Sequence, residues 1–204
     1  MEPEQCDPEP VILQVQDILR ETKAFCPVGK GTVSLSETED RDWINNWKKF
    51  FKPFRAASHI VIKPTWEEYT KERPDDVLIE IDPGIAFGTG SHETTQLCVR
   101  QLRKYMTPGA RLLDVGTGSG ILSILALMFG AGHAVGTDLD QCAVEAVAEN
   151  CAANGIDPAR FEMLIGNIIT DRAVQAQVGY GQYDIVVANI LAEVLLSLTP
   201  VITE

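Results

Sequence analysis

Apolar residues in the second half of the chain alternate between two periods. Short, wholly apolar runs, typical of strands buried on both faces, are separated by longer apolar or amphipathic helical stretches. The predicted strands are residues 111–115, 134–138, 161–165 and 183–191, and the predicted helices are residues 121–129, 141–153 and one that begins after 191. Such alternation predicts an α/β fold, with a parallel sheet covered by helices on both faces. Its ligand crevice should lie at the carboxyl ends of the strands, where the strand order reverses.

Upstream of residue 110 the pattern is less regular. Residues 1–9 are rich in Pro and Glu and are predicted to be disordered. Apolar residues at helical spacing then predict a short amphipathic helix, at positions 11, 12, 15, 18 and 19. Further short strands are expected at residues 32–35, 59–64 and 77–82.

The stretch "RDWINNWKKFFKPFR" (41–55) combines aromatic residues with lysines. On a helix, one side would carry Trp43, Trp47, Phe50, Phe51 and Phe54. Such a mixture can bind single-stranded nucleic acid, but helical spacing favours an aromatic face packed on a domain with its lysines in water. We therefore expect three regions: a partial N-terminal segment (1–40), an aromatic linker helix and strand (41–73) and the main domain (74–204).

Composition and charge restrict the classes of partner. With 204 residues and 45% hydrophobic content, the chain can form one α/β domain and a small appendage. It has neither an apolar run of about 20 residues nor the features of a secretory signal, so we expect a soluble cytoplasmic protein without membrane contact. The net charge is −12, divided as −6, +4 and −10 among the three regions. An acidic main domain disfavours direct nucleic-acid binding and favours a basic protein or an amine.

The strongest local signal is the stretch "DVGTGSG" (114–120). Gly116 and Gly118 allow the backbone to approach a ligand closely, ahead of a helix N-terminus. Asp138 lies 22 positions after Gly116, close to the spacing of about 20 that places a carboxylate on ribose hydroxyls. The NAD fingerprint would require glycine at position 121, which is Ile121, and the chain has no phosphate-binding P-loop. A nucleoside without pyrophosphate fits best, and Asp114 beside the turn would favour a cation. S-adenosylmethionine has these properties.

Several stretches together resemble the PrmA family, class I methyltransferases that modify protein L-eleven of the large ribosomal subunit. They are "DPGIAFGTGSHETT", "GILSILALMFGA", "GTDLD", "VVANIL" and "DWINNWKKFFKPFR" followed by "IVIKPTW", and they span roughly residues 40–204. The resemblance implies a Rossmann-like methyltransferase that uses S-adenosyl-L-methionine and acts on lysine or N-terminal amino groups of a basic ribosomal protein. It also implies that the loop from residue 82 covers the cofactor while the glycine turn holds its nucleoside.

The resemblance assigns roles to individual residues. Asn189 would line the methyl-transfer site as the catalytic residue. The implied cofactor contacts are Thr95, Gly116, Gly118, Asp138 and Asn189 itself. Phe87 would contact the cofactor as an apolar side chain of the covering loop, and Asn167 is included from its position alone. Simpler interpretations remain open: Thr94 or Thr95 as a helix-start residue, Asp138 as a helix cap and Asn189 as a residue that turns the chain at a strand end. Neither a metal nor a covalent intermediate is expected, because the sulfonium is already an activated leaving group and the cysteines lack metal-ligand spacing.

The chain also departs from the family pattern. It ends after the fourth predicted strand, although class I methyltransferases continue with further strands, and its N-terminal part is shorter than the family's substrate-recognition domain. We therefore expect a truncated chain. Two alternatives stay open: a cofactor-binding fragment that is inactive as it stands, and a methyltransferase of nucleic-acid bases. The sequence "ANIL" in place of an Asn-Pro-Pro-aromatic motif, and the acidic domain, disfavour the second.

Overall fold

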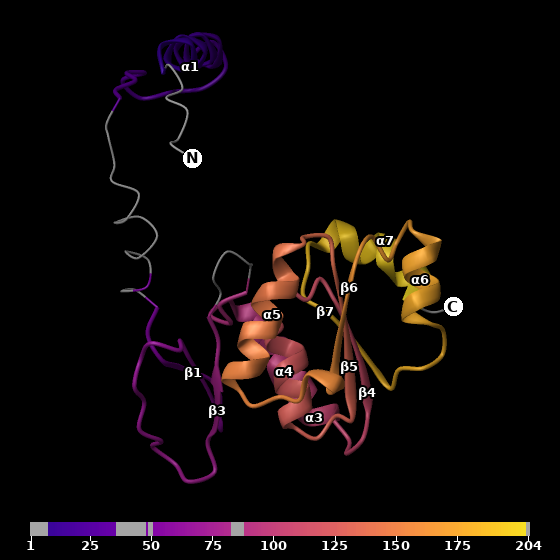
Figure 1. The fold of residues 1–204 in the computed structure, drawn as a ribbon. Helices are drawn as coiled ribbons and strands as arrows, with labels where there is room; N and C mark the ends of the chain where they lie inside the picture. The colour runs from indigo at the N-terminus through magenta and orange to yellow at the C-terminus, as the bar shows by residue number, and fades with distance from the viewer. Residues whose placement is uncertain (1–7, 36–47, 49–50, 83–87, 203–204) are drawn as a thin grey trace, which may run out of the picture. The chain divides into compact units, whose positions relative to one another are not determined.

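The computed structural model describes residues 8–35, 48, 51–82 and 88–202. The chain divides into two compact units, Met1–Phe50 and Phe51–Glu204 (Figure 1). The first unit contains helix α1 (Glu9–Thr22), which confirms the predicted amphipathic helix. Its apolar side chains remain accessible, with Val11, Leu13 and Ile18 each more than half exposed. The strand expected at 32–35 is wrong, because these residues pair with no other strand in the described part of the chain.

The aromatic linker helix lies mostly outside the described residues, including Trp43, Trp47 and Phe50. At its predicted end the structure differs from the expectation, because Phe54 begins strand β1 (Phe54–Ala57). Pro53 explains the difference, since proline lacks the N–H group that a helix interior requires and restricts the residue before it to extended conformations. The Phe51 ring packs instead against Phe54 and Trp66, with ring centroids 6.3 and 6.4 Å away.

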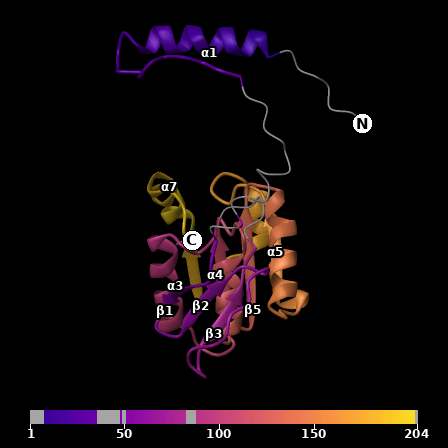
Figure 2. The ribbon, with the colours of Figure 1, turned by 90° about the vertical axis from the view of Figure 1, so that its left-hand side faces the viewer.

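Strands β1, β2 (Ile60–Lys63) and β3 (Val77–Glu80) form a three-stranded sheet in that order. β1 runs antiparallel to β2, and β3 runs parallel to it, which confirms the two strands expected at 59–64 and 77–82. Ile62 and Ile79 are completely buried. Figure 2 shows this sheet between two helices, α3 (Glu93–Tyr105) beside β1 and α5 (Cys142–Ala153) beside β3.

The main sheet has four parallel strands in the order β6-β5-β4-β7, which confirms the predicted parallel sheet. Its strands are β4 (Arg111–Val115), β5 (His133–Asp138), β6 (Phe161–Ile165) and β7 (Ile185–Ala188). The residues of β4 after Arg111 are all buried, as expected for a central strand. β7 forms one edge of the sheet, where Val186 is 38% exposed.

Helices cover both faces of the main sheet, as predicted (Figure 1). One hydrophobic core contains Leu112 together with apolar residues of α3, α4 (Ile121–Met128) and α5. The other contains Leu113 and apolar residues of α6 (Arg172–Val178) and α7 (Ala192–Ile202). A 3-10 turn, η2 (Pro158–Arg160), precedes β6. Among the helices of the described ranges, none is long and apolar enough to cross a lipid bilayer.

Candidate functional site

The order of the strands predicts a ligand crevice at the carboxyl ends of β4 and β7. From β4 the chain proceeds through β5 to β6 on one side, and it then returns to form β7 on the other side of β4. Ligands of open parallel sheets bind at such a reversal. Two predicted site residues follow these strand ends directly, Gly116 after β4 and Asn189 after β7.

The glycine-rich turn after β4 requires its glycines. Gly116, Gly118 and Gly120 have φ values of +75°, +54° and +82°, a region that other residues rarely adopt. A Cβ atom on Gly116 would collide with Cγ2 of Ile190, the residue after Asn189. The backbone N–H groups of Gly116 and Thr117 both donate to the Thr137 carbonyl, at 2.8 and 3.1 Å. The turn is therefore held against the end of β5 while its backbone stays close to β7.

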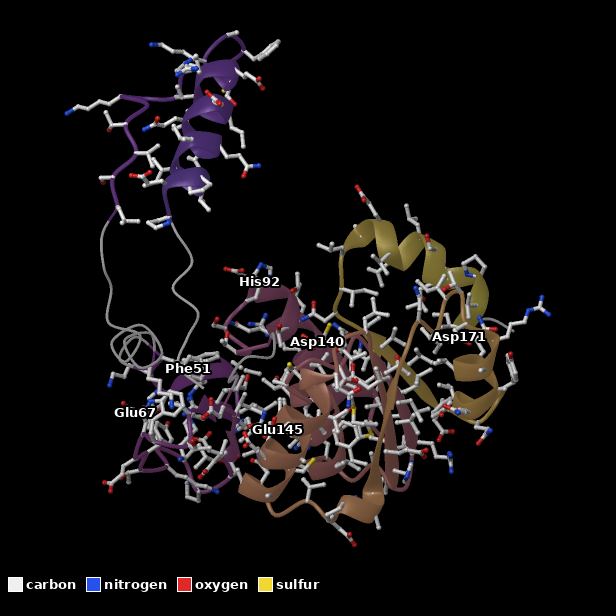
Figure 3. All side chains as sticks on the ribbon, turned by 45° about the horizontal axis from the view of Figure 1, so that its top comes forward. Phe51, Glu67, His92, Asp140, Glu145 and Asp171 are labelled. Atoms are coloured by element: carbon white, nitrogen blue, oxygen red, sulfur yellow. The ribbon has the colours of Figure 1, made fainter. Side chains whose placement is uncertain are left out.

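Asp138, the last residue of β5, is bonded directly to this turn. One carboxylate oxygen accepts a hydrogen bond from Gly118 N at 2.8 Å, and the other accepts from Asp140 N at 3.0 Å. The side chain is partly exposed, and the next residue, Leu139, is 71% exposed. The contact of the Asp138 carboxylate with a ribose stays a prediction. Figure 3 marks this end of the sheet with Asp140, which follows β5.

Thr95 and Asn189 are 94 positions apart in the chain and meet at the crevice, where Asn189 Nδ2 donates to Thr95 Oγ1 at 2.8 Å. Thr95 lies in the first turn of α3 and is 5% exposed. It does not cap the helix, because His92 at the N-cap accepts a hydrogen bond from Thr94 N at 3.2 Å (Figure 3). Because the side-chain Nδ2 of Asn189 donates to Thr95, the side-chain oxygen Oδ1 of Asn189 remains as an acceptor for another group.

The structure corrects the expectation that the Asp114 charge faces the ligand. Asp114 is only 1% exposed, and its carboxylate accepts a hydrogen bond from Ser123 Oγ at 2.8 Å. Burial raises the pKa of Asp114 from 3.8 to about 7, although the bond from Ser123 opposes the shift. Asp114 is therefore buried beneath the glycine turn and does not line the surface where the ligand is expected.

The charges around the crevice do not match a phosphate. Residues 112–159 include the glycine turn, β5 and α5, and they contain no lysine or arginine but several acidic residues. A nucleotide pyrophosphate is normally held by N–H donors with positive charge nearby. A nucleoside with a cationic side chain, such as S-adenosylmethionine, suits these acidic surroundings better.

One group of side chains in the described part of the chain lies close enough together to hold a metal ion, namely His59, Asp75 and Asp76. The Arg55 guanidinium already donates to both oxygens of Asp76, at 2.6 and 2.8 Å. This ion pair also lowers the pKa of Asp76 to about 2. We therefore assign these residues to the stability of the three-stranded sheet.

The remaining predicted residues have different outcomes. Phe87 lies outside the described residues. Asn167 follows β6, and its side-chain oxygen accepts hydrogen bonds from Ile169 N and Thr170 N at 2.9 and 3.3 Å, so its contact with an adenine stays a prediction. Sequence reasoning missed Asn150, a helical residue that is 1% exposed and bonded to the glycine turn. A polar residue on the apolar face of a predicted helix is the signal that could have revealed it.

The parallel sheet, the glycine turn after its first strand and the acidic residue ending the second define the fold of a class I methyltransferase. A family model described as ribosomal protein L11 methyltransferase (PrmA) matches residues 10–204. The chain belongs to this family.

Individual relatives agree with this assignment. A ribosomal protein L11 methyltransferase of Lachnoclostridium phytofermentans is 50% identical over 94% of this chain and 62% of the relative. Another, from Lachnospira eligens, is 51% identical over 94% of this chain and 60% of its own length. The crystal structure of ribosomal protein L11 methylase from Lactobacillus delbrueckii subsp. bulgaricus has a TM-score of 0.65 at 37% identity, covering 75% of this chain and 74% of that one. The chain thus spans about three fifths of the length of these curated relatives.

Proposed function

We propose that the chain is the cofactor-binding part of a methyltransferase that uses S-adenosyl-L-methionine to methylate lysine or N-terminal amino groups of a ribosomal protein. Family membership supports the reaction class, since the similar relatives carry the name ribosomal protein L11 methyltransferase. The observation that carries the proposal is the hydrogen bond of 2.8 Å from Asn189 to Thr95 at the carboxyl ends of the strands. It joins Asn189, the residue implied for methyl transfer, to Thr95, an implied cofactor contact, beside the turn implied for the nucleoside.

The chain's own groups suit this chemistry. When bound, the cofactor would supply a methyl group on a sulfonium. The lone pair of a neutral amine would form the N–C bond as the C–S bond breaks, S-adenosylhomocysteine would be the leaving group, and the amine would lose its proton to solvent. The Asp138 carboxylate would hold the ribose. The backbone of the turn at Gly116 and Gly118 would lie against the nucleoside. The Asn189 carbonyl oxygen would accept a hydrogen bond from the substrate amine and align its lone pair with the methyl group. The Thr95 hydroxyl fixes the orientation of that amide, because it accepts the hydrogen bond from the Asn189 N–H group.

The charge of the domain favours a basic protein over nucleic acid as substrate. Residues 74–204 carry a net charge of −10, and acidic surfaces attract basic proteins and repel phosphates. We accordingly propose that ribosomal protein L11 is the substrate and that the protein acts in the cytoplasm, where ribosomes are found. A base methyltransferase is the alternative that the experiment below excludes or supports.

Transfer of a labelled methyl group tests the proposal. The 204-residue chain and a chain extended to the full length of its relatives are each incubated with methyl-labelled S-adenosylmethionine and either purified ribosomal protein L11 or ribosomal RNA. We expect the extended chain to label the amino groups of the protein and to leave the RNA unlabelled. Label on RNA bases alone would overturn the protein-substrate assignment. Activity of the extended chain alone would identify the 204-residue chain as the inactive cofactor-binding part.

A further inference from the structure

Asn150 of α5 and Asn154, the C-cap residue of that helix, cover the open edge of β3. Residues 80 and 82 direct their backbone groups away from β2, since the intervening Ile81 N donates to Lys63 O of β2 at 2.9 Å. Asn154 bonds to both backbone groups of Glu80, accepting from its N–H at 2.9 Å and donating to its carbonyl at 2.6 Å. Each asparagine amide has one acceptor and two donor hydrogens, so it can replace a neighbouring strand at one residue.

Asn150, one helical turn earlier, makes the same pair of bonds to Asp82. Its Oδ1 accepts from Asp82 N at 2.8 Å, and its Nδ2 donates to Asp82 O at 3.1 Å. The second hydrogen of each amide has a different destination. Asn154 donates to the Asn150 backbone carbonyl at 2.8 Å, whereas Asn150 donates to the Ser119 carbonyl of the glycine-rich turn at 2.9 Å. Asn150 therefore joins α5, the end of β3 and the glycine turn in one network.

The bond between Asn150 and Ser119 is buried, and Ser119 makes a second hydrogen bond that also holds the glycine-rich turn in place. Asn150 and Ser119 are 1% and 0% exposed, so water does not compete for the bond between them. The Ser119 hydroxyl donates to the Gly88 carbonyl at 2.7 Å, which ties the turn to the residues ahead of α3. A side chain on Gly88 would not fit, because its Cβ atom would lie 2.8 Å from the Ser119 hydroxyl oxygen.

We propose that Asn150 is a positioning residue for the cofactor, whose amide holds the Ser119 carbonyl and so keeps the glycine-rich turn in the conformation that receives the nucleoside. This inference rests on the proposed function, since it takes the turn as the cofactor surface. Loss of the amide leaves the Ser119 carbonyl buried without this donor, and the turn must shift to find another. Cofactor affinity should therefore fall, because the bound conformation is no longer the one that the free chain adopts.

Asn154 provides a matched control. Replacement of either asparagine with alanine removes two bonds to the backbone at β3 and one to another carbonyl, from the same helix and the same helix face. Both variants should therefore lose thermal stability, but Asn150→Ala alone disturbs the glycine turn. The measurement is calorimetric titration of each chain with S-adenosylhomocysteine at a temperature where thermal melts show it to be folded.

We expect Asn150→Ala to raise the Kd at least about tenfold over the wild-type chain, and Asn154→Ala to change it less than about threefold. Similar Kd values for the two variants would overturn the inference, because a merely structural role lowers the melting temperature of both variants and gives Asn150 no separate effect on cofactor affinity. The wild-type titration tests the proposed function separately. If the wild-type chain does not bind the cofactor, the proposed function fails, and so does any positioning role.

A second pair of variants keeps the test decisive if Asn150→Ala does not fold. Asn150→Asp and Asn154→Asp preserve side-chain size and the acceptor for the β3 N–H groups, but each replaces the amide donors with a carboxylate oxygen. Asn150→Asp should then weaken S-adenosylhomocysteine binding at least about tenfold more than Asn154→Asp. Equal binding by this pair would refute the positioning role in the same way.

Discussion

The buried carboxyl group of Asp114 makes the stability of the domain depend on pH in an unusual direction. Its pKa rises from 3.8 to about 7 on folding, with burial as the largest cause. Between these pH values the folded state holds a proton that the unfolded state has released, so stability falls as pH rises through this range. At about 1.36 kcal/mol per pKa unit, the total loss between pH 4 and pH 8 is on the order of 4 kcal/mol.

The variant Asp114→Asn isolates this effect. Asparagine keeps the side-chain shape and an acceptor for the Ser123 hydroxyl, but it has no charge to bury. Urea denaturation of both chains at several pH values gives the difference in their free energies of unfolding. We expect that difference to shift in favour of the variant by about 4 kcal/mol from pH 4 to pH 8. Ser123→Ala should move the pH range over which the free energy of unfolding falls to higher pH, since the hydrogen bond from Ser123 lowers the pKa of Asp114. A difference independent of pH would refute the reasoning.

Three further predictions concern the crevice. Asp138→Ala should weaken S-adenosylhomocysteine binding by about 1.5–3 kcal/mol, or roughly tenfold to 150-fold in Kd. The control Asp140→Ala removes the same charge nearby and should change the Kd less than about threefold. Equal losses of affinity in calorimetry would indicate a purely electrostatic effect. Thr95→Val should lower kcat for methyl transfer by an extended chain, because the Asn189 amide loses the acceptor that orients it; an unchanged kcat would contradict the orienting role. Gly116→Ala should lower the free energy of unfolding by more than Gly109→Ala, because both have φ near +80° but only a Cβ at 116 meets another side chain; equal destabilisation in urea would exclude that contact.

Strands of the main sheet could be predicted from short apolar runs, although the strand predicted at 183–191 is shorter in the structure, where β7 spans Ile185–Ala188. The prediction of residues 111–115 matches β4, and that of 161–165 matches β6. In the linker, the apolar period was misleading, because Phe54 contributes to a helical pattern and yet lies in β1 after Pro53. The spacing of the aromatic residues predicts a helix here, but Pro53, which lacks a backbone N–H group, prevents the helix from continuing to Phe54.

The candidate site was predictable only in part. Asp138 follows from its spacing to Gly116, and the structure adds that its carboxylate is bonded to Gly118 N. Asn150 could not be found in this way, because its partners are backbone atoms of residues 31 and 68 positions away. Spacing in the sequence identifies groups on adjacent strands, but a contact between a helix side chain and a distant backbone depends on how the layers pack.

Calorimetric titration of the purified 204-residue chain with S-adenosylhomocysteine, and separately with NAD, tests the central claim most directly. Three left-handed glycines, the Asp138 carboxylate and the absence of lysine and arginine from residues 112–159 favour a nucleoside without phosphate. We expect saturable, one-to-one binding of S-adenosylhomocysteine and no measurable heat with NAD. Binding of NAD with no response to S-adenosylhomocysteine would contradict the assignment of this crevice to a methyltransferase cofactor.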